Sequence, residues 1–238
     1  APIYWTDWTG SDQDSGAGFI GSGTITTPTS TVTVTYTNPQ GIGFYQTSGG
    51  TYYYSNGSDG PAGTSPYTSA QVDNRPPTTD IVALQYAGTQ SLVFSQAIAN
   101  PVFAFVSLNG NGYGFDQDFD ILSFGGADGN ACGYWGCGTS YKNIVTVNGK
   151  TEYQLLGTGE PHGTLRFTGT FDTVSWRSLS NENWNGFTVG VQETAVAFCT
   201  ANPTAPECSP VSAVPEPASM ALMGLGLAGL AAVRRRKA

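Results

Sequence analysis

The sequence predicts an all-β protein: one antiparallel β-sandwich, jelly-roll-like, followed by a short linker and a single C-terminal hydrophobic helix. Composition points this way, because 32 Gly, 14 Pro and only 11% charged residues are typical of short strands joined by tight turns. Residues 31–37 read TVTVTYT, with apolar side chains on one face and threonines on the other. No amphipathic helical pattern precedes residue 218.

Ten to thirteen short strands are expected along the chain. The segment 101–108, PVFAFVSL, is apolar on both faces, which predicts a central strand. Asn148-Gly149 predicts a hairpin turn between two strands. Residues 38–77 are rich in Gly, Ser, Tyr and Pro; we expect long loops around one short strand, serving as a binding surface or as tolerated decoration. The other expected strands span residues 4–8, 16–26, 80–86, 91–95, 115–124, 143–147, 152–156, 164–170, 171–177 and 187–198.

The C-terminal region divides the chain into three predicted parts. Residues 1–199 form the β-sandwich, residues 200–213 a Pro/Ser/Ala-rich linker, and residues 214–238 a tail that reads VPEPASMALMGLGLAGLAAVRRRKA. Two prolines keep the tail's start extended and accessible. An apolar run over 218–233 follows, and the chain then ends in a basic cluster that resists translocation. The residues of the opening motif and the basic cluster are Val214, Pro215, Glu216, Pro217, Arg234, Arg235, Arg236 and Lys237.

The apolar run is short for a permanent membrane anchor. Its sixteen residues form roughly 24 Å of helix, against a hydrocarbon core of ~30 Å. A buried core helix is the alternative, but a core helix does not normally end in four consecutive cations. The arginines can also extend the reach by snorkelling. We therefore expect a helix that enters the membrane.

The tail, from Val214 to Ala238, resembles the PEP-CTERM sorting signal of Gram-negative bacteria. In that family the Pro-Glu-Pro signature, here Pro215-Glu216-Pro217, is recognised by an exosortase, a membrane cysteine protease or transpeptidase. The resemblance implies export, transient anchoring in the inner membrane with the folded part in the periplasm, and processing near the signature. The processed protein is then expected at the cell surface or outside the cell.

Residues 95–191 also resemble ectodomains that are often attached to such tails. This resemblance implies a secreted β-sandwich and transfers no functional residue. The phrases that carry it are NPVFAFVSL at 100–108, FDQDFDILSFG at 115–125, GTLRFTGTFDTVSW at 163–176 and NGFTVGVQE at 185–193.

Charge limits the partners of the folded part. Residues 1–213 contain sixteen Asp and Glu but five Lys and Arg, a net charge of −11. Such a surface argues against nucleic acid and anionic lipid, and is compatible with neutral glycans or divalent cations. The N-terminus, Ala1-Pro2-Ile3, lacks an initiator Met and a secretory signal. We therefore expect a mature form whose leader has been removed.

The four cysteines fall in two close pairs, Cys132 with Cys137 and Cys199 with Cys208. This spacing favours two local disulfides formed in an oxidising compartment. Pairing across the two clusters remains open. A zinc site is the rival interpretation, but these spacings match no familiar ligand set.

Asp116, Asp118 and Asp120 lie in FDQDFDI and would share one face of a strand. Three adjacent carboxylates repel one another unless a hard cation bridges them, so Ca²⁺ is a candidate ligand. The spacing excludes an EF-hand loop. A solvated acidic face is the alternative that we favour, and no other cofactor is expected.

Tyr134 and Trp135 lie between Cys132 and Cys137 on a glycine-hinged loop. Their rings are suited to stacking on sugar rings, with further aromatic residues in support. The alternative is that Trp135 folds back over the disulfide as part of the core. The further aromatic candidates are Trp5, Trp8, Tyr52, Tyr53, Tyr54 and Trp184.

No catalytic residues are predicted. The single histidine, His162, is expected in a solvent-exposed turn, and no nucleophile motif occurs. Sixteen acids leave a glycosidase carboxylate pair open, but nothing in the sequence selects one. We expect a non-enzymatic envelope or matrix protein with a structural or interaction role linked to extracellular polysaccharide. A lectin-like glycan-binding module is the first alternative, and a polysaccharide hydrolase is the second.

Overall fold

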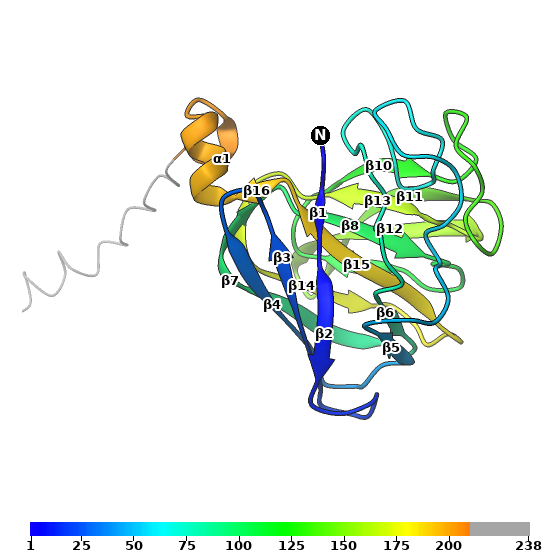
Figure 1. Cartoon of the computed structure of the whole chain (residues 1–238). Coiled ribbons are helices and arrows are strands. Elements are labelled where there is room, and N and C mark those ends of the chain that lie inside the picture. The colour runs from blue at the N-terminus through cyan, green and yellow to red at the C-terminus, as the bar shows by residue number, and fades with distance from the viewer. Residues whose placement is uncertain (210–238) are drawn as a thin grey trace, which may run out of the picture. The chain divides into compact units, whose positions relative to one another are not determined.

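The structure, a computed structural model, describes residues 1–209 (Figure 1). The chain forms two antiparallel sheets packed face to face, as the predicted all-β sandwich requires. The first sheet has the strand order β10-β13-β8-β15-β6-β5, with β1 also paired to β15. The second has the order β11-β12-β9-β14-β7-β4-β3-β2, with β16 also paired to β7. The predicted hydrophobic helix over 218–233 lies outside the described residues.

The described strands are more numerous than expected, and several of them, such as β7, β11 and β12, are longer than predicted. In the first sheet they are β1 (Tyr4–Trp5), β5 (Phe44–Gln46), β6 (Ile81–Leu84), β8 (Val102–Val106), β10 (Asp120–Phe124), β13 (Gly163–Arg166) and β15 (Asn185–Val191). In the second they are β2 (Asp7–Ser11), β3 (Phe19–Thr26), β4 (Thr31–Asn38), β7 (Gly88–Ala99), β9 (Tyr113–Phe115), β11 (Gly138–Val147), β12 (Lys150–Gly159), β14 (Thr170–Ser178) and β16 (Glu193–Thr194).

Alternation in the sequence is reproduced in β4. Val32, Val34 and Tyr36 are fully buried between the sheets, while Thr31, Thr33 and Thr35 are exposed. The hairpin of β11 and β12 also turns at Asn148 and Gly149, which both have positive φ angles of 52° and 76°.

The expected first strand is divided between the two sheets. Thr6 lies between β1 and β2, and both its amide and its hydroxyl donate hydrogen bonds to the Val189 carbonyl. The Trp8 amide then donates to the Asp80 carboxylate over 2.9 Å. Its indole N–H donates to Thr188 Oγ1. The indole ring is therefore buried in the main core between the sheets.

A third layer covers the outer face of the first sheet. Strand β8 is buried on both faces, because its other side packs on the long segment 47–80 (cyan in Figure 1). Tyr54 and Tyr67 of this segment are fully buried in a second hydrophobic cluster with Val102, Ala104 and Val106. The segment lacks strands, so much of a region expected to be loop is in fact core.

Hydrogen bonds hold residues 47–80, which we call the covering segment, in place. The Asn74 side chain both accepts from the Ile3 amide and donates to the Ile3 carbonyl. The Arg75 guanidinium donates to the carbonyls of Ser55, Asn56 and Gly57. These bonds close the segment on itself and on the N-terminal strand, which compensates for its lack of sheet pairing.

The strand predicted over 187–198 is wrong at its C-terminal end. It stops at Val191, and after β16 the chain forms the helix α1 (Ala195–Ala201). Thr194 caps this helix, its hydroxyl accepting a hydrogen bond from the Ala197 amide. Three alanines supply helix propensity, which outweighs the apparent alternation.

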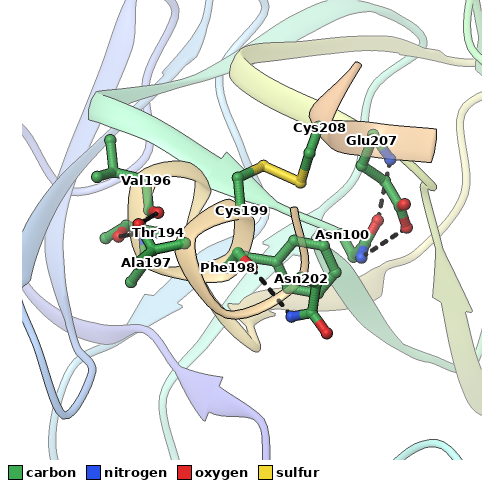
Figure 2. Close-up of a disulfide and its surroundings, with 11 residues drawn as sticks. Asn100, Thr194, Val196, Ala197, Phe198, Cys199, Asn202, Glu207 and Cys208 are labelled. Carbon is green, nitrogen blue, oxygen red and sulfur yellow. Dashed lines mark hydrogen bonds between the residues drawn. A yellow bond between two sulfur atoms is a disulfide. The ribbon is translucent and has the colours of Figure 1, made fainter. Parts of the chain in front are cut away.

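The folded unit extends beyond the expected boundary at residue 199. Cys199 on α1 is bonded to Cys208 in the short 3-10 helix Pro206–Cys208 (Figure 2). Glu207 accepts a hydrogen bond from Asn100 at the end of β7. Residues 200–208 therefore fold onto the compact unit Ala1–Cys208 instead of forming the first part of a free linker.

The Cys199–Cys208 bond should stabilise this closing element locally. Replacing both cysteines by serine removes a crosslink that is expected to contribute about 2–3 kcal/mol for so short a loop. We expect the α1 amides to lose hydrogen-exchange protection, while those of β8 and β15 keep theirs. Unchanged protection of α1 would show that packing alone holds the helix.

Candidate functional site

The most exposed aromatic side chain among residues 1–209, that of Trp135, lies on the disulfide loop 132–137. Cys132 and Cys137 are bonded, as predicted, and Gly133 and Gly136 pair across the loop. Trp135 is 52% exposed and Tyr134 is 42% exposed. The alternative in which Trp135 folds back into the core is therefore wrong.

His162 forms the base on which this loop rests. A Cβ atom on Gly133 would lie 2.0 Å from the His162 ring, so only glycine allows the loop to approach so closely. The imidazole is fully buried, and its Nδ1 lies 2.9 Å from the Glu160 carbonyl oxygen. The prediction of a solvent-exposed turn histidine is wrong. Burial lowers the pKa of His162 and keeps its ring from direct contact with solvent.

The covering segment ties the loop down from the other side. The Asn56 amide donates to the carbonyls of Cys132 and Gly133, each over 3.1 Å. The Ala131 amide donates to the Thr64 carbonyl. The loop is fixed by its packing on His162, by the hydrogen bonds from Asn56 and by the disulfide. In this conformation it directs Tyr134 and Trp135 outward.

A continuous aromatic surface surrounds the loop. The Tyr53 ring lies 5.1 Å from Tyr134 and 4.9 Å from Trp184 between ring centroids. Trp135 and Trp184 are 6.5 Å apart. We call this set the aromatic surface; it consists of Phe44, Tyr53, Tyr134, Trp135 and Trp184. Its members come from three regions that are distant in sequence, residues 44–53, 134–135 and 184.

An open groove of about 490 Å³ adjoins the aromatic surface. Trp135 and Trp184 belong to its walls, and the remaining side chains around it are hydroxyl, amide and carboxyl groups. Those polar residues are Ser107, Asn109, Glu160, Asn181, Glu182 and Asn183. The groove therefore combines flat apolar faces with groups that exchange hydrogen bonds.

Two glutamates give the groove its electrostatic character. Glu160 accepts hydrogen bonds from the Ser107 hydroxyl, over 2.6 Å, and from the Asn109 amide. Burial raises the pKa of Glu182 to about 7, and the negative charge of Glu160 adds to the shift. One carboxyl oxygen of Glu182 is buried and has no hydrogen-bonding partner within residues 1–209.

The other aromatic candidates have different roles. Trp8 and Tyr54 are fully buried, and Trp5 is 9% exposed, so these three belong to the cores. The Tyr52 hydroxyl donates to the Pro76 carbonyl inside the covering segment. Only Tyr53 and Trp184 of the six further candidates join the aromatic surface.

The three aspartates do not gather at one point. The expected strand 115–124 is interrupted, since β9 ends at Phe115 and β10 begins at Asp120 in the other sheet. Asp118 pairs with Lys142 over 2.6 Å, and Asp120 lies 3.9 Å from Arg166. Within residues 1–209, no group of three or more His, Cys, Asp and Glu side chains is placed to hold a metal ion.

Sequence reasoning identified Tyr134 and Trp135 but missed the polar groove beside them. Neither Glu160 nor Glu182 belongs to a sequence motif that indicates a binding site. A weak signal was present in Asn181-Glu182-Asn183-Trp184, where polar side chains and a tryptophan share one loop between β14 and β15.

The raised pKa of Glu182 implies a pH-dependent cost of folding. Between the ordinary pKa near 4.5 and the folded value of about 7, the folded state binds more protons, so stability falls as pH rises through this window. Glu182→Gln should therefore stabilise the chain at pH 8 by on the order of 1–2 kcal/mol, discounted for partial exposure, and have little effect at pH 4. Denaturant unfolding at both pH values measures this; an equal gain at both would exclude ionisation as the cause.

Comparison with known proteins gives one match. The family model of the PEP-CTERM protein-sorting motif matches residues 213–237. No curated protein and no solved structure matches the chain. The matched residues lie outside those that the structure describes, as do Pro215, Glu216, Pro217 and the basic cluster 234–237. Among residues 1–209, no helix has the length and apolar character needed to cross a membrane.

The order of the sequence features in the tail agrees with the family match. The Pro-Glu-Pro signature, the apolar run and the terminal cations all lie within the matched residues. The chain therefore carries a PEP-CTERM protein-sorting motif at residues 213–237, which implies export, recognition by an exosortase and transient membrane anchoring through the C-terminus.

Proposed function

We propose that this exported protein binds extracellular polysaccharide through the groove beside Trp135 and Trp184. The folded domain is carried in the periplasm while the tail is anchored, and it acts at the cell surface or in the matrix after processing. The observation that carries the proposal is Trp135, held outward with 52% exposure on a crosslinked loop at the groove wall.

Sugar rings have the surface chemistry that this groove complements. Their C–H faces pack on aromatic rings, and their hydroxyls both donate and accept hydrogen bonds. The amides of Asn181 and Asn183 offer both functions, and Glu160 offers acceptors. An apolar protein partner would leave these polar groups without compensation, which is costly. The polar lining therefore favours a glycan over a hydrophobic protein surface.

The walls should contribute a measurable part of the affinity. We expect Trp135→Ala to weaken binding to a matrix oligosaccharide by about tenfold, because one aromatic contact contributes about 1.5 kcal/mol. Tyr141→Ala is the matched control, since Tyr141 is 47% exposed on β11 and does not line the groove. A glycan array identifies the ligand and calorimetry measures both variants. Failure of the array to find any bound sugar would remove the proposal.

Processing of the tail is tested separately from binding. In its native host, the mature exported protein should end near Val214–Pro217 and lack Arg234–Lys237, as mass spectrometry would show. A variant with alanine in place of Pro215, Glu216 and Pro217 should keep its tail, because the exosortase recognises this signature. An intact basic end in the exported, unaltered protein would contradict the sorting account.

Hydrolysis of the bound glycan is a second candidate function. Two glutamates line one groove, and the raised pKa of Glu182 suits a group that gives its proton to a glycosidic oxygen. Glu160 would then remove a proton from the attacking water. We expect release of new reducing ends from a bound oligosaccharide, abolished by Glu182→Gln. Binding without any cleavage would reject this function and leave the first one standing.

A further inference from the structure

Two carboxyls that belong to no ion pair line the same groove. Five ion pairs occur among the described residues, and they involve Asp59, Asp73, Asp118, Asp120 and Glu152. Neither Glu160 nor Glu182 belongs to any of them. Among the described residues that line the groove, none is Lys, Arg or His. The two carboxyls therefore face the groove without a cation.

Partial burial makes this arrangement costly until a ligand arrives. One Glu182 oxygen is shielded from water and has no hydrogen-bonding partner among the described residues. A carboxylate in such a position favours its neutral form unless a positive charge approaches it. A ligand that brings a cation would stabilise the ionised form of Glu182 as it binds. A neutral ligand would leave the repulsion between the two carboxyls in place.

The walls also favour a cation. The faces of tryptophan rings carry negative charge density, and an ammonium within about 6 Å of a ring centroid is attracted to them. Trp135 and Trp184 line the same groove as the two glutamates. At longer range, the net charge of −11 on residues 1–213 attracts cationic polymers and raises their local concentration.

We propose that the groove binds a sugar with a free, protonated amine, the ammonium lying between the carboxyls of Glu160 and Glu182 and the faces of Trp135 and Trp184. The ligand class is an amino-sugar polysaccharide that is at least partly unacylated. This inference rests on the proposed glycan-binding function and names its substrate class. An N-acetylated sugar keeps the same ring faces but has no charge to place between the glutamates.

Two glucosamine hexamers that differ only in N-acetylation test the inference. Binding is measured by calorimetry with the purified full chain at pH 6. This pH lies below the ordinary pKa of an α-amino group, about 7.7–8.0, so amines of that kind are mainly protonated. We expect the deacetylated hexamer to bind at least tenfold more tightly, with the advantage shrinking between 50 mM and 500 mM salt. Glu160→Gln combined with Glu182→Gln should abolish the discrimination between the two hexamers.

Two controls separate recognition from general attraction to an acidic surface. A hexalysine peptide carries the same charge without sugar rings, and it should bind much more weakly than the deacetylated hexamer. Trp135→Ala should weaken the binding of the deacetylated hexamer but not the binding of the peptide. The inference would be overturned if hexalysine bound as tightly as the deacetylated hexamer. It would also be overturned if Trp135→Ala left the affinity for the hexamer unchanged.

The remaining outcomes distinguish this inference from the proposed function. Equal affinity for the two hexamers, or preference for the acetylated one, would overturn the amino-sugar assignment while glycan binding stands. Binding of neither hexamer, together with a glycan array that finds another bound sugar, would also overturn the assignment alone. Binding of no sugar at all would overturn both.

Discussion

The need to cover the outer face of the first sheet governs the rest of this structure. Strands β6, β8 and β15 are buried on both faces, so one side packs against the second sheet and the other requires a cover of its own. Residues 47–80 supply that cover with Tyr54, Tyr67 and Val72. Exposing these faces would place large apolar areas in water, at about 25 cal/mol for each Å².

The same covering segment builds the candidate site. Tyr54 is directed inward to the second hydrophobic cluster, while its neighbour Tyr53 packs on Tyr134 and Trp184 at the surface. Asn56, two residues later, holds the backbone of the disulfide loop. Stability and the proposed recognition therefore depend on one segment, whose inward side chains are core and whose outward side chains shape the aromatic surface.

The sequence predicted the elements that depend on local pattern. Alternation in β4, the two-sided apolar run of β8 and the Asn148-Gly149 turn were correct because each reflects short-range chemistry. Helix α1 was missed because small and large side chains alternate over Thr194–Phe198, as they do in many strands. The cap at Thr194 indicates a helix only once the end of β15 is known. His162 was placed in an exposed turn because its burial depends on the approach of Gly133, a contact between distant segments. Glu182 was missed for the same reason, since the fold brings it to the groove that Glu160 lines.

Affinity of the Asn56→Ala variant for the oligosaccharide tests most directly whether the covering segment builds the site. Asn56 does not line the groove, and within the described part of the chain its side-chain amide bonds only to the backbone of the disulfide loop and the hydroxyl of Ser55. Loss of two hydrogen bonds should loosen the loop, so affinity should fall severalfold while the unfolding free energy changes by only about 1–2 kcal/mol. Unchanged affinity in a folded Asn56→Ala protein would contradict the account, because the two hydrogen bonds from Asn56 to the disulfide loop would then not be needed to position Trp135.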